Sequence, residues 1–336
     1  MAKASPTQAW LWHQRLSHLN FNYINLLSKK DVVIGLPKVK YVKDQLCSSC
    51  EVSKAKRSSF KTKAVPSSKG QLNLLHMHLC GLMRVASING KKYILVIVDD
   101  YSEYIWTLFL RSKDETPEVL KESLIMIQWN LQALVISVRT DRGTEFLNKT
   151  LYAFFKEEGI EHKTSTPRTP EQNGVVKRRN RTLVEVSRMM LSASKLPLFF
   201  WAEALQCTIL KNRSIIIPTH EKMAYHIIND RKPSIKHIYI FGCTCYLTRD
   251  GENLDKMKEK GDLCIQVGYS TQSKGYKVYN KRTRLIVESI HLRFDEIKEM
   301  SETFVANDTS GLVPQRQKES DFDNSGPTHN YKMFLL

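Results

Sequence analysis

The order of secondary-structure signals between residues 72 and 195 constrains the fold of this chain more than any other feature. Three apolar, β-rich runs come first, LNLLHMHL, KKYILVIVDD and YIWTLFLRS, and Asn89-Gly90 is typical of a tight hairpin turn. Helices are predicted over residues 116–129 and 149–158, with strands in ALVISVRTD and EHKTS. The stretch PEQNGVVKRRNRTLVEVSRMMLSAS then predicts a long helix, because its apolar residues recur at helical spacing (Val176, Leu183, Val186 and Met190).

This order, β-β-β-α-β-α-β-α, predicts a mixed α/β (α+β) domain with a ribonuclease-H-like fold. In that fold the first strand, the end of the fourth strand and the long late helix meet at one point. Enzymes of the class place a carboxylate at each position and hold two divalent metal ions about 4 Å apart, which activate a water or hydroxyl at a phosphodiester. Topology alone does not establish the activity, so the residues at these three positions decide it.

Four candidate metal ligands lie in the first 50 residues. His13 and His18 occur in WLWHQRLSHLN, about one and a half helical turns apart, and Cys47 and Cys50 form CSSC. Two imidazoles and two thiolates are a ligand set that tetrahedral Zn²⁺ prefers. The segment has few apolar residues for a core of its own, which favours a structural zinc ion. The alternative is a redox-inert cysteine pair beside two surface histidines.

The basic charge of the chain is concentrated in two places. Lys and Arg number 51 against 34 Asp and Glu, a formal net charge of +17. Residues 1–70 carry 13 basic against 3 acidic side chains, residues 171–240 carry 12 against 5, and the stretch between is neutral. This distribution predicts a polyanionic partner, nucleic acid rather than a membrane.

Two basic runs are the candidate phosphate contacts, although a charge run is more often a solvated surface. One is the linker that contains Lys54, Lys56 and Arg57, which is also a candidate nuclear import signal; the other lies at the start of the long helix (Lys177, Arg178, Arg179 and Arg181).

The sequence has no apolar run of about 18–20 residues and begins without a signal-peptide pattern. An intracellular protein of the nucleus or cytoplasm is therefore expected, without membrane contact. Its seven cysteines do not predict a disulfide framework.

Several motifs in fixed order carry a family resemblance. WHQRLSHLN with CSSC, VIVDDYSEYIWTLFLRSKDE, VRTDRGTEF and TSTPRTPEQNGVVKRRNRTLVEVSRMML resemble the pre-integrase zinc module and integrase core of copia-type retrotransposon Pol polyproteins. FFWAEAL, FGCTCYL and VGYSTQSKGYKVYN resemble the segment that follows that core. The resemblance covers about residues 10–297. It implies DNA integration as the ancestral process, DNA as the partner, Mg²⁺ or Mn²⁺ at the catalytic centre, structural zinc and a homo-multimer.

Resemblance and composition together predict six segments. These are a GAG-pre-integrase HHCC zinc module over residues 8–53, a basic linker over 54–70, a ribonuclease-H-like integrase core with a trailing helix over 71–215, a connector over 216–240, a small SH3-like β-barrel over 241–297 and a disordered tail over 298–336.

The three catalytic acids of the family can be placed on this sequence one residue at a time. Asp141 in VRTDRGTEF matches the middle acid. The first belongs to an LHxD pattern, which reads LLHMHL here and puts His78 in its place. The last belongs to a QNGVVER pattern, which reads QNGVVKR and puts Lys177 there. An imidazole and an ammonium do not replace the oxygen ligands that Mg²⁺ prefers, so the metal site is predicted to be lost.

Two details of this site are left open by the sequence. Lys177 is able to pair with Asp141 and close the former metal site. Glu145 and Glu171 are near in sequence, but a ligand moved by several residues would spoil the metal spacing. We therefore expect an integrase-derived, DNA-binding protein without catalysis. The alternatives are an active Mg²⁺- or Mn²⁺-dependent integrase, and an interaction protein or pseudogene product that binds no DNA.

Overall fold

The computed structural model describes seven stretches of the 336-residue chain: residues 2–53, 68–165, 174–212, 216–217, 220–248, 261–270 and 274–296. The basic linker residues Lys54, Lys56 and Arg57, Glu171 and the predicted tail lie outside these stretches.

A five-stranded sheet forms the centre of the molecule. Its strands are β1 (Leu74–Cys80), β2 (Tyr93–Asp99), β3 (Ile105–Leu110), β4 (Ser137–Thr140) and β5 (Glu161–Thr164), in the spatial order β3-β2-β1-β4-β5. The first three strands pair antiparallel, whereas β4 runs parallel to both β1 and β5. The predicted order of strands and helices is confirmed, and the sheet is that of the ribonuclease-H-like fold.

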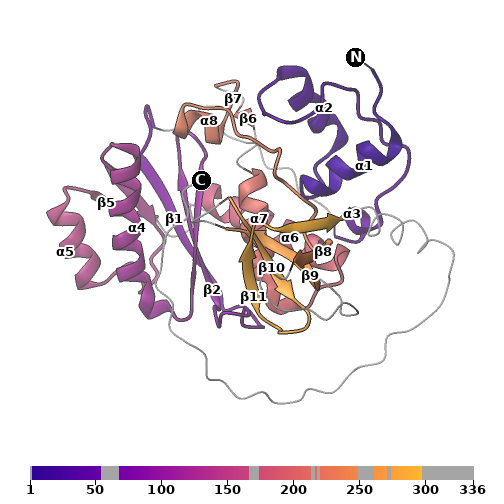
Figure 1. The fold of residues 1–336 in the computed structure, drawn as a ribbon. Coiled ribbons are helices and arrows are strands. Elements are labelled where there is room, and N and C mark those ends of the chain that lie inside the picture. The colour runs from indigo at the N-terminus through magenta and orange to yellow at the C-terminus, as the bar shows by residue number, and fades with distance from the viewer. Residues whose placement is uncertain are drawn as a thin grey trace.

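Helices cover both faces of this sheet, and the side chains of each strand alternate between the two faces. Leu95 and Ile97 of β2 pack against α4 (Thr116–Leu131) and α5 (Lys149–Glu157). Ile94, Val96 and Val98 pack on the other face, under α6 (Gly174–Ala193) and α7 (Trp201–Asn212). Figure 1 shows the two helix pairs on opposite sides of the strands. On β1 the same alternation puts Leu75 and Met77 on the α4 side, so His76 and His78 belong to the α6 side.

The N-terminal segment contains α1 (Pro6–Arg15), α2 (Phe21–Lys30) and α3 (Ser48–Ser53). Contrary to expectation, it has a substantial hydrophobic cluster, built on Trp10, Trp12, Ile24 and Leu27 among others. Side chains from later in the chain complete this cluster: Met189, Ile216, Met223, Ile235 and Ile238. The expectation of few apolar residues was wrong, because most of the buried cluster belongs to the N-terminal segment itself.

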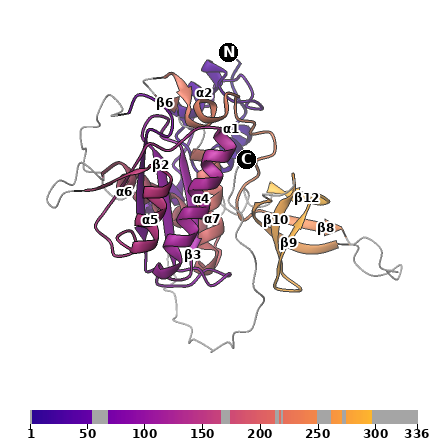
Figure 2. The same ribbon diagram turned by 90° about the vertical axis from the view of Figure 1, so that its left-hand side faces the viewer.

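A second antiparallel sheet follows the core. A hairpin of β6 (Ile216–Ile217) and β7 (Lys222–Met223) and the short helix α8 (Ala224–Asn229) precede it. The strand order of the second sheet is β11-β10-β9-β8-β12, with β11 and β12 at the two ends of that order. Figure 2 shows this sheet standing beside the central domain. Its strands are β8 (Thr244–Thr248), β9 (Gly261–Tyr269), β10 (Tyr276–Asn280), β11 (Ile286–Ser289) and β12 (Leu292–Asp295).

Single 3₁₀ turns at Lys113–Glu115 and Leu198–Phe200 lead into α4 and α7. No helix in the described stretches combines the length and the hydropathy needed to span a membrane.

Candidate functional site

His78 and Asp141 meet at one edge of the central sheet. β1 and β4 are parallel neighbours in which His76 is opposite Arg139, so two residues further on His78 lies beside Asp141. The Nδ1 atom of His78 is 3.0 Å from Oδ2 of Asp141. Lys177 lies in the first turn of α6, close enough to lower the pKa of Asp141. The fold therefore brings together the three positions that the sequence singled out.

The carboxylate of Asp141 is already engaged. The hydrogen bond with His78 is the main reason that the pKa of Asp141 is lowered, opposed by partial burial and assisted by the charge of Lys177. The backbone N–H of Gly143 donates a further hydrogen bond to Oδ1 at 3.3 Å. The hydrogen-bonding partner of Asp141 is thus His78, and not Lys177 as the sequence allowed. One carboxylate, one imidazole and one ammonium do not form an oxygen-rich site for two divalent cations.

Glu145 does not take the place of an acid at position 78 or 177. Its side chain is buried, and its Oε2 atom lies 3.8 Å from the ammonium nitrogen of Lys113. The Glu145 carboxylate is therefore paired with the turn that precedes α4.

The basic run of α6 divides into paired and unpaired residues. Arg179 forms an ion pair with Glu103, and Arg181 Nε lies 2.9 Å from Oε1 of Glu185 on the next helical turn. Lys177 and Arg178 are exposed, with no ion pair to any residue of the described stretches. Arg179, predicted as a phosphate contact, is therefore partly buried and paired with Glu103.

Two further cations flank the site and were not singled out from the sequence. Arg139 lies on β4 two residues before Asp141, and Arg142 directly follows it. Neither side chain has a hydrogen bond or an ion pair within the described part of the chain, and Arg142 is exposed. The run VRTDRG contains the signal that could have identified them, since both arginines lie within two residues of Asp141.

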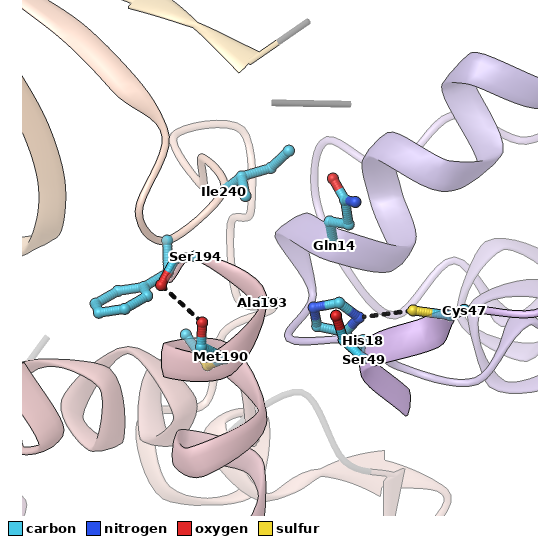
Figure 3. Close-up of a pocket in the computed structure, with 9 residues that line it drawn as sticks. Gln14, His18, Cys47, Ser49, Met190, Ala193, Ser194 and Ile240 are labelled. Carbon is cyan, nitrogen blue, oxygen red and sulfur yellow. Dashed lines mark hydrogen bonds between the residues drawn. The ribbon is translucent and has the colours of Figure 1, made fainter. Parts of the chain in front are cut away.

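A second cluster joins the four predicted metal ligands. His18 Nδ1 is 3.4 Å from Cys47 Sγ, and His13 Nε2 is 3.6 Å from Cys50 Sγ. All four ligand atoms lie within 4.8 Å of one another. Figure 3 shows the contact between His18 and Cys47. The two histidines do not share a helix as predicted, because α1 ends at Arg15 and His18 follows in a turn with a φ of 57°.

The geometry of this cluster fits zinc. Zn–S bonds of about 2.3 Å and Zn–N bonds of about 2.1 Å at a tetrahedral angle separate sulfur from nitrogen by about 3.6 Å, close to both observed distances. His13 Nδ1 is 2.8 Å from the carbonyl oxygen of Leu19, which fixes the ring with Nε2 facing the cysteines. Hydrogen bonds from Cys50 and from the two imidazoles lower the pKa of the Cys47 thiol, which favours the thiolate form that binds metal.

The central fold and the meeting of β1, β4 and α6 define a ribonuclease-H-like domain of the integrase type. Three family models match in sequence order: the GAG-pre-integrase domain over residues 1–55, the integrase core domain over residues 71–170 and the retroviral polymerase SH3-like domain over residues 243–306. The chain is therefore an integrase-region segment of the retrovirus-related Pol polyprotein family.

The curated relatives are Pol polyproteins of plant transposons. The chain is 31% identical over 313 residues to the retrovirus-related Pol polyprotein from transposon TNT 1-94 of Nicotiana tabacum, which covers 90% of this chain and 23% of that polyprotein. It is 25% identical over 321 residues to the polyprotein from transposon RE2 of Arabidopsis thaliana, covering 95% and 21% of the two chains. The chain thus spans less than a quarter of the length of these relatives.

Solved integrase structures are more distant. The HTLV-2 integrase catalytic core domain in complex with magnesium, in a trimeric form, is 17% identical, with a TM-score of 0.37 over 48% of this chain and 98% of that one. A simian T-cell lymphotropic virus intasome in complex with PP2A regulatory subunit B56 gamma is 13% identical, with a TM-score of 0.39 over 68% and 84%.

Proposed function

We propose that this chain is an integrase-derived nucleic-acid-binding protein that has lost metal-dependent catalysis. The observation that carries the proposal is the 3.0 Å contact between His78 and Asp141. In place of three carboxylates, the site holds one carboxylate that is hydrogen-bonded to an imidazole and lies near an ammonium. Two-metal phosphodiester chemistry needs oxygen ligands at all three positions, so no catalytic step is derived through Mg²⁺ or Mn²⁺ here.

DNA binding is supported by the cations around this site. Lys177, Arg178 and Arg142 are exposed, and Arg139 is half-buried on the adjoining strand. These four side chains form no ion pair with an acidic residue of the described stretches, in contrast to Arg179 and Arg181. Cations without a partner are available to phosphate groups and carry no information about base sequence.

We further propose that His13, His18, Cys47 and Cys50 bind one structural zinc ion. The four-residue set offers two nitrogen and two sulfur ligands in a mostly buried position, which is the composition of a closed structural site. The zinc content of the purified full chain tests this assignment. About one equivalent is expected in wild type and none in a Cys47→Ser/Cys50→Ser variant; a full equivalent in that variant would overturn it.

Strand transfer tests the loss of catalysis. The full chain, incubated with donor DNA ends and Mn²⁺, is expected to produce no strand-transfer product. Activity that disappears in Asp141→Asn would overturn the proposal and favour an active integrase. Duplex binding is tested separately in EDTA, where the wild type is expected to bind with a steep salt dependence. No binding at low salt would favour an interaction protein without a DNA partner.

A further inference from the structure

A buried ion pair joins the N-terminal segment to the end of the second sheet. Arg15 is the last residue of α1, and Glu296 directly follows β12. The Arg15 guanidinium donates to both carboxylate oxygens of Glu296, with Nε at 3.0 Å from Oε1 and 3.2 Å from Oε2 and with Nη2 also bonded to Oε2. Only 18% of the Arg15 side chain and 8% of the Glu296 side chain are exposed. This is the two-pronged geometry in which an arginine binds a carboxylate most strongly.

Two aromatic rings lie against the guanidinium. Its carbon atom lies 5.4 Å from the ring centroid of Trp12, on the same helix, and 5.3 Å from that of Tyr239. The Tyr239 ring is stacked on Phe294 of β12, with the centroids 3.8 Å apart. The next residue after Tyr239, Ile240, donates its backbone N–H to Glu296 Oε1 at 2.8 Å. Three segments therefore meet at the pair: α1, the stretch before β8, and β12.

The same helix carries a ligand of the proposed zinc site. His13 lies two residues before Arg15 on α1, and His18 three residues after it. Figure 3 shows a pocket lined by sequence neighbours of these residues: Gln14 and His18 line one side, and Ile240 and the C-terminal end of α6 line the other. His13 on α1 and Cys50 on α3 would hold a metal ion between these two helices, and the Arg15–Glu296 pair holds α1 against β12. A rotation of α1 disturbs both sets of contacts.

We propose that the Arg15–Glu296 pair couples zinc binding to the docking of the second sheet, with Glu296 as a positioning residue for the zinc site. The proposal rests on the zinc site proposed above. When the pair is formed, α1 is already held in the orientation that presents His13 to the cysteines. Because coupling between two sites is reciprocal, the factor by which zinc favours the docked sheet equals the factor by which docking strengthens zinc binding.

Zinc affinity of the full chain, measured by competition with a chromogenic chelator, tests this coupling. Glu296→Gln removes the charge of the pair and keeps the size of the side chain. We expect it to weaken zinc binding at least about five-fold, the lower end of typical coupling between sites. Glu221→Gln is the matched control, because it breaks an exposed ion pair between the hairpin and Lys30 of the same N-terminal segment. The control is expected to bind zinc as the wild type does.

Amide hydrogen exchange supplies a second readout that does not depend on chelator competition. In the wild type, removal of zinc is expected to speed exchange in β12; in Glu296→Gln exchange there is expected to be fast with or without zinc. Arg15→Lys keeps a charge but loses the two-pronged contact, and serves if Glu296→Gln does not fold. It is expected to give an intermediate loss of zinc affinity.

Two results would overturn the proposal in distinguishable ways. Tight zinc binding that is unchanged in folded Glu296→Gln or Arg15→Lys, with exchange in β12 indifferent to zinc, would remove the coupling and leave the zinc site intact. A wild-type chain that binds no zinc would remove the zinc site and the coupling with it.

Discussion

His78 Nδ1 lies 3.0 Å from Asp141 Oδ2, at the edge of the sheet where parallel strands β1 and β4 end. In the family pattern the residue at position 78 is an acid that would repel Asp141 unless a cation lay between them. An imidazole at this position needs no such cation, because its Nδ1–H group can donate a hydrogen bond directly to the carboxylate. The proposed loss of the metal site rests on this contact within the protein.

The His78–Asp141 contact predicts a pH-dependent contribution to stability. A carboxyl group whose pKa is lowered on folding contributes stability above its unfolded pKa of about 3.9, and the contribution is lost as the pH falls through the folded pKa. We expect the wild type to exceed Asp141→Asn in free energy of unfolding by at most about 1 kcal/mol at pH 6, because the two side chains are 19% and 25% exposed. Urea denaturation at pH 6 and below pH 3 measures the difference. An advantage that grows on acidification would contradict the assignment.

Restoring both acids is expected to restore a divalent metal site. His78→Asp with Lys177→Glu places three carboxylates where the chain now has one. At a Mn²⁺ concentration a hundred times the Kd, binding would stabilise the double variant by about 2.7 kcal/mol. Thermal unfolding with and without Mn²⁺ measures this shift, and the wild type and both single variants, each with at most two carboxylates, are the controls. A double variant that is indifferent to Mn²⁺ would show that these two substitutions are not what removed the site.

The meeting of His78 and Asp141 could be predicted from sequence because it follows from strand order and from side-chain alternation along β1. The four zinc-site residues could be predicted because their chemical types and close spacing are unusual. Their arrangement could not: the end of α1 at Arg15 depends on the turn that holds Ser17 and His18 at positive φ.

The ion-pair partners of the charged side chains could not be predicted from the local sequence. The run from Lys177 to Arg181 reads as one basic patch, yet Arg179 pairs with Glu103 from the turn between β2 and β3. Arg15 and Glu296 are 281 residues apart. Such partners are fixed by tertiary packing, and neither residue carries a local signal of its partner. The long-range members of the cluster under α1 and α2, such as Met223 and Ile235, also carry no local signal of their partners.

Removal of zinc is expected to destabilise the protein without unfolding all of it. Zinc at a hundred to a thousand times its Kd would contribute about 3 to 4 kcal/mol to the folded state. The hydrophobic cluster of the N-terminal segment is shared with the rest of the chain, so the central sheet should remain folded after chelation. Thermal unfolding with excess chelator, compared with zinc-loaded protein, measures the loss. Cys50→Ser should unfold at the chelated temperature with or without zinc; an added effect of chelator on that variant would point to a different metal site.

The unpaired cations of α6 are expected to contact DNA phosphates, and the paired ones are not. Each phosphate contact that is lost should lower the slope of log affinity against log salt by about 0.9. Lys177→Ala/Arg178→Ala is therefore expected to reduce the slope by about 2, uniformly across duplex sequences.

Arg181→Ala is the matched control on the same helix and should change the slope little, because Arg181 is paired with Glu185. Arg179→Ala should leave the slope unchanged and lower the unfolding temperature, since it leaves Glu103 without its partner. Fluorescence anisotropy of a labelled duplex between 50 and 200 mM salt measures the slopes. Equal slopes for the wild type and the Lys177→Ala/Arg178→Ala variant would place the DNA contacts elsewhere on the chain.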